Sequence, residues 1–93
     1  MVNRNIIHIR KKLDKLDNLF LEIIKKRSKL VDYVIKNKKF KKDIVDKKRI
    51  NFILKNISKK SKKMNIDPKI TNKIWKSMIN AFIDYEFRNF KKK

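Results

Sequence analysis

Four charged residues lie at positions where an apolar side chain is expected. Arg10, Arg27, Lys38 and Glu86 fall on the hydrophobic stripes of otherwise amphipathic segments. A charge on a buried face costs several kcal/mol unless another group pairs with it. Three cations and one acid that point inward therefore indicate a pocket for a small anion.

The spacing of the cations predicts how they are shared between chains. Arg27 and Lys38 are eleven residues apart, close to three helical turns, so they share a face at a backbone separation of about 16 Å. Both side chains are long enough to converge on one small ligand. Arg10 lies about 25 Å from Arg27 along the same helix, which is too far. In an antiparallel dimer, however, Arg10 of one chain can approach Arg27 of the other, so we expect two composite sites per dimer.

Composition excludes several kinds of chemistry. The 93 residues are enough for one domain with a modest core. Because the chain has no Gly and only one Pro, we expect neither tight turns nor Gly-rich phosphate loops. Because it has no Cys, disulfides, thiolate metal sites and a Cys nucleophile are excluded. The opening MVNRNIIHIRKK contains no apolar run long enough for a signal peptide or a membrane span. We therefore expect a cytoplasmic protein that has no membrane partner.

The formal net charge of +20 comes from 29 Lys and Arg against 9 Asp and Glu. Such a charge attracts nucleic acid, an anionic membrane or an anionic metabolite. The lysines are scattered along all segments, however, and the abundance of Lys, Ile and Asn also fits the coding bias of an AT-rich genome. A nucleic-acid-binding helical module is the alternative of a different class, but it needs a recognition helix after a short turn. The chain has neither a Gly-containing turn nor aromatics interleaved on a basic face, so nucleic acid is the weaker expectation.

Periodicity predicts an all-α fold of three helices, the first of which is unusually long. Apolar residues recur at alternating three- and four-residue steps from about Asn5 to Lys38. Such a helix is about 50 Å long, whereas a globule of this chain length is only about 30 Å across. The stripe therefore needs a partner, and an obligate homodimer is the simplest solution. The apolar stripe consists of Leu13, Leu16, Phe20, Ile23, Leu30 and Val34, and Arg27 completes the series.

Two shorter helices are predicted after breaks at 39–45 and 65–68. Asp43 or Asp46 can cap the second helix, which runs to about Lys63. Asp67 and Pro68 suit the start of the third helix. We expect the inward residues to be Ile50, Ile53, Leu54 and Ile57 on the second helix and Ile70, Ile74, Trp75, Met78, Ile79 and Phe82 on the third, with Phe52 also in the core.

Three segments of the chain carry a family resemblance. Residues 9–38 read IRKKLDKLDNLFLEIIKKRSKLVDYVIKNK, which resembles the opening helix of the all-helical (type II) chorismate mutases. Residues 44–54, IVDKKRINFIL, resemble the family's Ile-x-Asp-Pro-x-Arg-Glu segment, and residues 66–79, IDPKITNKIWKSMI, resemble its Leu-Asp-Pro helix start. The matching positions in the opening helix are Arg10, Asp14, Asp17, Arg27, Leu30, Val31 and Lys38.

The resemblance implies one chorismate-mutase-like helical domain over residues 1–93, built as a three-helix protomer in an intertwined homodimer. It also implies conversion of chorismate to prephenate, a step of aromatic amino acid biosynthesis. This Claisen rearrangement needs no nucleophile, metal or cofactor. Negative charge grows on the ether oxygen as the C–O bond breaks, so preorganised donors lower the barrier, while binding selects the compact reactive conformer.

The family pattern assigns a task to each charged residue. Arg10 of the partner subunit and Arg27 are expected to hold the two carboxylates, for which the planar guanidinium is suited. Lys38, or alternatively Lys39, is expected to hydrogen-bond the ether oxygen and a carboxylate. Glu86 aligns with the second ether-oxygen donor, and because a carboxyl group donates only when protonated, we expect faster turnover at mildly acidic pH. Asp46 and Arg49 are expected to shape the end of the pocket that holds the substrate hydroxyl.

Two positions depart from the family pattern and leave the substrate open. Ile50 stands where a Glu that contacts the ring hydroxyl is usual, and Phe82 stands where a small polar residue is frequent. Both changes make the predicted pocket more apolar. The related isochorismate-pyruvate lyases also carry an aliphatic residue in place of that Glu, so a lyase is the alternative on the same fold.

Purely structural roles are also open for the same side chains. Arg27 can be an interface charge paired with Asp14 or Asp17 of another helix. Asp46 can be an N-cap, with Arg49 paired to it one turn later. Glu86 can pair with Arg88 or Arg10. A catalytically inert dimerisation domain would leave the inward Arg and Lys positions without a purpose.

Overall fold

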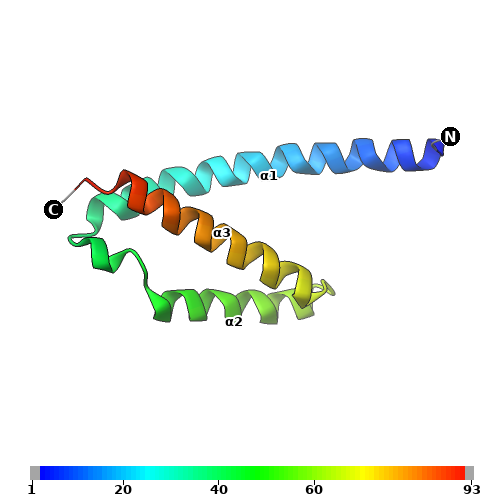
Figure 1. The fold of residues 1–93 in the computed structure, drawn as a ribbon. Coiled ribbons are helices and arrows are strands. Elements are labelled where there is room, and N and C mark those ends of the chain that lie inside the picture. Colours follow the sequence, from blue (N-terminus) through cyan, green and yellow to red (C-terminus); the bar gives the residue numbers. More distant parts are fainter. Residues whose placement is uncertain (1–2, 92–93) are drawn as a thin grey trace. The chain divides into compact units, whose positions relative to one another are not determined.

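The computed structural model describes residues 3–91, and this part of the chain is helical with no strand (Figure 1). The expectation of an all-α fold is therefore confirmed. No helix within the described range is long and apolar enough to cross a membrane. The elements are α1 (Arg4–Asn37), the short 3₁₀ turn η1 (Lys41–Asp43), α2 (Lys47–Lys63) and α3 (Pro68–Asn89).

The chain divides into two compact units, Met1–Leu30 and Val31–Lys93. In the first unit the described residues are the start of α1. Asn3 caps this helix, because its Oδ1 accepts a hydrogen bond from the Asn5 N–H at 2.7 Å. The last turns of α1, together with η1, α2 and α3, make up the second unit.

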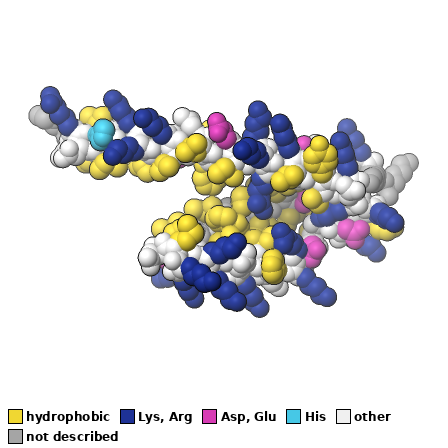
Figure 2. Space-filling view, turned by 180° about the vertical axis from the view of Figure 1, so that it is seen from behind, with side chains coloured by type: hydrophobic (Ala, Val, Ile, Leu, Met, Phe, Trp, Pro, Cys, Tyr) yellow, Lys and Arg dark blue, Asp and Glu magenta, His cyan; other side chains and the backbone are white. Residues whose placement is uncertain are grey.

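The helix of the first unit has an uncovered apolar stripe. Leu13, Leu16 and Ile23 are 52%, 59% and 63% exposed, and Phe20 is 44% exposed. Figure 2 shows apolar side chains along one edge of this helix and mainly Lys and Arg side chains along the opposite edge. The predicted periodicity of the stripe is thus present, and its apolar face is open in the single chain.

In the second unit, α2 and α3 form a helical hairpin (Figure 1). Asn65 makes the turn with a left-handed φ of 58°, a conformation that usually requires Gly. The Ile66 N–H donates to the Ser61 carbonyl at 2.8 Å and the Asn65 N–H donates to the Lys62 carbonyl at 3.2 Å, which is the Schellman pattern. The expectation that a chain without Gly has no tight turn is therefore wrong, because Asn65 adopts the left-handed conformation in place of Gly.

The start of α3 agrees with its prediction. Asp67 is the N-cap, its side chain accepts a hydrogen bond from the Lys69 N–H at 2.9 Å, and Pro68 occupies the first turn. Two buried hydroxyls hold the helices together beside this cap, since Ser61 and Thr71 are 2.7 Å apart through their side-chain oxygens. Ser61 also donates to the Ile57 carbonyl, so burial of these groups leaves their polar atoms satisfied.

The core of the second unit is small. Ile35, Ile44 and Ile79 are its buried apolar residues, and Ile44 is only 2% exposed. The remaining predicted core residues of this unit are half-buried, apart from Phe52 on α2 and Ile70 and Ile74 on α3. The residues in this half-buried group are Ile50, Ile53, Leu54, Ile57, Trp75, Met78 and Phe82.

Three apolar residues predicted to be inward are exposed. Ile70 is 55% exposed and Ile74 is 38% exposed, because three short helical segments do not enclose all of α3. Phe52 is 59% exposed, and its ring lies beneath the Arg49 guanidinium at 5.5 Å rather than in the core. For the single chain, the predicted burial of these residues is wrong.

Candidate functional site

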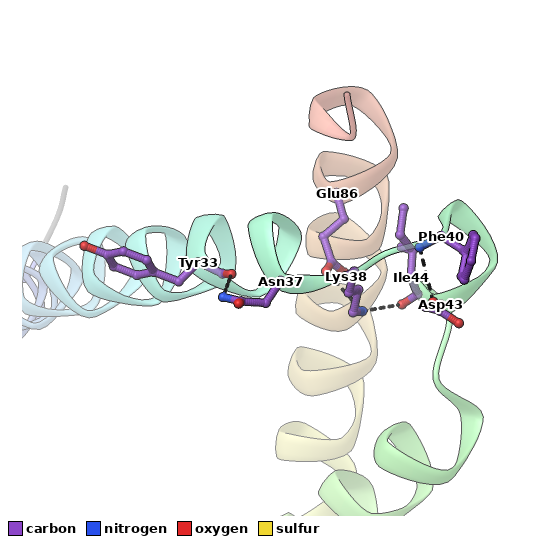
Figure 3. Close-up of polar contacts among 7 residues, drawn as sticks. All are labelled: Tyr33, Asn37, Lys38, Phe40, Asp43, Ile44 and Glu86. Carbon is purple, nitrogen blue, oxygen red and sulfur yellow. Dashed lines mark hydrogen bonds and ion pairs between the residues drawn. The ribbon is translucent and has the colours of Figure 1, made fainter. Parts of the chain in front are cut away.

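The structure brings two of the four anomalous charges together. The Lys38 Nζ lies 3.3 Å from the Glu86 Oε1, although the residues are 48 positions apart in the chain. Their side chains are 21% and 9% exposed, so the ion pair is partly shielded from water. Figure 3 shows Glu86 pointing from α3 toward the Lys38 side chain just beyond the end of α1.

A main-chain carbonyl holds Lys38 from a second side. The Lys38 ammonium donates to the Ile44 carbonyl at 3.2 Å (Figure 3). Ile44 is the most deeply buried apolar residue, which anchors its carbonyl next to the site. Because an ammonium has three hydrogens and these acceptors engage two, the third can be donated to a ligand.

The chain between α1 and α2 is folded by its own hydrogen bonds. The Phe40 N–H donates to the Asp43 Oδ2 at 3.3 Å, and the Asp43 N–H donates to the Phe40 carbonyl at 3.0 Å. The Ile44 N–H then donates to the Lys41 carbonyl at 3.2 Å. This turn carries the Ile44 carbonyl to Lys38, whereas the neighbouring Lys39 is exposed. The geometry therefore favours Lys38 over Lys39 as the lysine of the site.

Asp46 and Arg49 have structural contacts at the start of α2. The Asp46 Oδ1 accepts a hydrogen bond from the Arg49 N–H at 3.0 Å, which makes Asp46 the N-cap. The Arg49 guanidinium stacks over Phe52, and both Asp46 and Arg49 are exposed. Ile50 on α2 is half-buried in the same unit.

Phe82 and Glu86 are one turn apart on α3, and this spacing places them on the same side of the helix. Phe82 is half-buried and Glu86 is 7% exposed. Arg88, one of the alternative partners predicted for Glu86, instead donates to Asp84 at 3.0 Å. The ion-pair partner of Glu86 in the described chain is Lys38.

Arg10 and Arg27 lie on the helix of the first unit. Arg10 is exposed and Arg27 is half-buried. In the second unit, the ion pair between Lys38 and Glu86 joins predicted site residues from different elements.

Two polar contacts of this region were not predicted. The Ile44 carbonyl is a main-chain group, so no side-chain pattern announces it. The Tyr85 hydroxyl donates to the Asp32 Oδ1 at 2.6 Å and joins α3 to the last turns of α1. That hydrogen bond raises the pKa of Tyr85 above its ordinary value, burial and the Asp32 charge raise it further, and Arg88 lowers it. In the sequence, the only signal of this contact was Asp32 itself, an acid within a strongly basic helix.

This arrangement is suited to binding an anionic ligand without attacking it. Lys38 offers an ammonium donor, and Glu86 offers a carboxyl group that accepts when ionised and donates when protonated. Both are held on separate elements by groups already in place, which is the property required of preorganised electrostatic stabilisation.

Comparison with known proteins identifies the family of this chain. The family model described as Chorismate mutase type II matches residues 9–87. The chain belongs to this family, and the expectation drawn from its three motifs is confirmed. The matched range contains Arg10, Arg27, Lys38 and Glu86. Searches of curated proteins and of solved structures gave no significant match.

Proposed function

We propose that this protein is a chorismate mutase, which rearranges chorismate to prephenate. The observation that carries the proposal is the partly shielded pair of Lys38 and Glu86, 3.3 Å apart on separate elements of a chain of this family. The reaction needs hydrogen-bond donors for one ether oxygen. The side chains of Lys38 and Glu86 lie close enough together to serve the same oxygen.

The transition state explains why such a pair suits the reaction. As the C–O bond breaks ahead of C–C bond formation, negative charge develops on the ether oxygen. Lys38 donates to this oxygen with the ammonium hydrogen not used by Ile44, and protonated Glu86 donates from the other side. Substrate therefore replaces the Lys38–Glu86 contact with two contacts to itself. Loss of one such preorganised donor lowers kcat by about 10²–10³-fold in comparable sites.

Arg27 and Arg10 of the partner subunit complete the proposed site by binding the two substrate carboxylates. The exposed stripe of Leu13, Leu16 and Ile23 supports a homodimer, because a 34-residue amphipathic helix needs a cover for its apolar face. We propose that the whole chain works as one such domain in a cytoplasmic homodimer.

Asp46 and Arg49 are proposed to bind at the hydroxyl end of the substrate. One carboxylate oxygen of Asp46 is engaged in capping α2, and the other is available for the ligand. Ile50 and Phe82 are proposed to form apolar walls of the pocket.

Isochorismate-pyruvate lyase is the second candidate, and Ile50 is the observation that favours it. An aliphatic side chain at this position, half-buried on α2, cannot hydrogen-bond a ring hydroxyl. The lyase releases pyruvate from isochorismate and leaves salicylate through a pericyclic step that the same electrostatic groups can serve.

Incubation of the purified protein with chorismate and, separately, with isochorismate distinguishes these activities. We expect prephenate from chorismate and no pyruvate or salicylate from isochorismate. Salicylate and pyruvate from isochorismate alone would identify the lyase. No product from either substrate would contradict the enzymatic proposal altogether.

A further inference from the structure

A second polar tie crosses the same pair of helices beside the candidate site. The Tyr85 hydroxyl on α3 donates to the Asp32 carboxylate on α1 at 2.6 Å. Tyr85 immediately precedes Glu86, and Asp32 lies six residues before Lys38. Both Tyr85 and Asp32 are half-buried. The two ties therefore join the same two stretches of chain.

We infer that the Asp32–Tyr85 hydrogen bond positions Glu86 opposite Lys38. Neither Asp32 nor Tyr85 is a catalytic residue in this inference, because neither is placed against the substrate. The contribution to turnover rests on the proposed function, whereas the positioning of the Lys38–Glu86 pair does not.

The two ties differ in stiffness. Lys38 follows the last residue of α1, and its side chain has more rotatable bonds than that of Tyr85, so its ion pair restrains the rotation of α3 less. Tyr85 has a rigid ring with two rotatable bonds, and Asp32 lies within the helix on a short side chain. A phenol that donates to a carboxylate makes a charge-assisted bond, and 2.6 Å is typical of such bonds. The stiff tie is thus the one able to set the rotation of α3.

The position of the tie on α3 lets it persist when substrate is bound. Adjacent helical residues point about 100° apart, so Tyr85 and Glu86 leave α3 in different directions. A ligand that separates Lys38 from Glu86 does not have to displace Tyr85 from Asp32. The tie can therefore keep the two donors at a constant separation after their direct contact is lost.

Removing the phenol hydroxyl is expected to leave the protein folded. Asp32 and Tyr85 line a hollow of about 390 Å³, together with Ile35, Lys36 and Phe90. Water in this hollow can solvate the Asp32 carboxylate when the hydroxyl is absent. Tyr85→Phe therefore removes the hydrogen bond without leaving the Asp32 carboxylate buried and unsolvated.

The chain provides a matched control for this substitution. Tyr33, the only other tyrosine, is 63% exposed, and Figure 3 shows its ring pointing away from Lys38 and Glu86. Tyr33→Phe removes the same hydroxyl from the same unit. A change seen in Tyr85→Phe and not in Tyr33→Phe is therefore specific to the tie.

Proton NMR of the full chain tests the positioning directly. We expect a nuclear Overhauser contact between the Lys38 ε-methylene and the Glu86 γ-methylene in the unmodified protein and in Tyr33→Phe. The intensity of this contact should fall several-fold in Tyr85→Phe. It should also fall in Asp32→Ala, which removes the same hydrogen bond and replaces Tyr85→Phe as the test if that variant does not fold. A folded variant of either kind that keeps the contact at full intensity overturns the inference. This measurement needs no substrate, so it tests the positioning of the Lys38–Glu86 pair independently of the proposed activity.

Chorismate turnover distinguishes positioning from general support of the fold. We expect Tyr85→Phe to lower kcat by about ten- to a hundredfold with little change in KM, since a small misplacement of a donor has effects of this size. The loss should vanish when the same substitution is made in a Glu86→Ala protein. An equal loss in both backgrounds would mean that Tyr85 acts independently of Glu86, which overturns the inference.

Discussion

Glu86 places an acid on the apolar stripe of α3 and keeps it 3.3 Å from the Lys38 ammonium. The sequence predicted both residues as site groups, because each occupies a stripe position where a hydrophobic side chain is expected. The family resemblance placed both at one ether oxygen, and so near each other, but it did not predict the direct ion pair that joins these residues across 48 positions of the chain. Nor could it predict the Ile44 carbonyl, because main-chain groups are common to all residue types.

Turnover by the wild-type protein is expected to be faster at mildly acidic pH than at neutral pH. The physical reason is that ionised Glu86 accepts a hydrogen bond from Lys38, whereas only the protonated carboxyl donates to the ether oxygen. Glu86→Gln carries a permanent donor and should give a flatter profile. The measurement is kcat as a function of pH for both proteins. Parallel pH profiles would contradict the proposed role of Glu86.

The raised pKa of Tyr85 leads us to expect a loss of stability at alkaline pH. Its pKa in the folded protein is raised above 10.0 mainly by the hydrogen bond to Asp32, with Arg88 acting in the opposite direction. Above about pH 10 the unfolded chain loses the phenol proton first, so the free energy of unfolding decreases as pH rises. Tyr85→Phe lacks this contribution.

Urea unfolding of wild type and Tyr85→Phe near pH 9 and pH 11 checks this expectation. The stability advantage of the wild type should be largest near pH 9 and should shrink toward pH 11. Lysine deprotonation affects both proteins equally, so a constant difference between them would contradict the assignment.

At the scale of elements, the ends of the helices were predictable and the burial of their faces was less so. Asp46, Asp67 and Pro68 carry side-chain signals for helix starts, and the structure uses all three as predicted. The left-handed Asn65 was not predicted, because only Gly marks such positions strongly. Exposure of Ile74 and Phe52 escaped prediction because periodicity reports which face is apolar, not whether another element covers it.

The cap of α3 is expected to be a measurable part of the stability of the hairpin. Asp67→Ala removes the acceptor for the Lys69 N–H, and loss of such a cap costs about 1 kcal/mol. Asp84→Ala is a suitable control, since Asp84 belongs to an exposed pair with Arg88 worth about 0.2–0.5 kcal/mol. Urea unfolding at neutral pH should separate the two variants, and equal losses would show that the cap contributes nothing particular.

At the scale of the whole molecule, the open stripe of the first unit requires an explanation. Leu13, Leu16 and Ile23 are each more than half exposed, and a soluble chain seldom leaves such a contiguous apolar surface uncovered. The net charge of +20 opposes self-association at long range. A homodimer thus needs the apolar contact of this helix to outweigh charge repulsion.

Leu16→Lys tests this balance by placing a charge in the stripe. We expect sedimentation to give twice the 11.4 kDa chain mass for wild type and a shift toward monomer for the variant. Asn18→Lys adds the same charge on another face of the helix and should remain dimeric. If both variants dissociate alike, net charge rather than the stripe controls assembly; if wild type is monomeric, the dimer proposal is wrong.

The central claim, that this chain catalyses the chorismate rearrangement through charged side chains, is tested most directly by prephenate formation in wild type and Arg27→Ala. We predict prephenate from wild type, unchanged turnover in the exposed-lysine control Lys26→Ala, and loss of at least about 10²-fold in Arg27→Ala with its oligomeric state unchanged. No prephenate from the wild type, or wild-type turnover in Arg27→Ala, would contradict the claim.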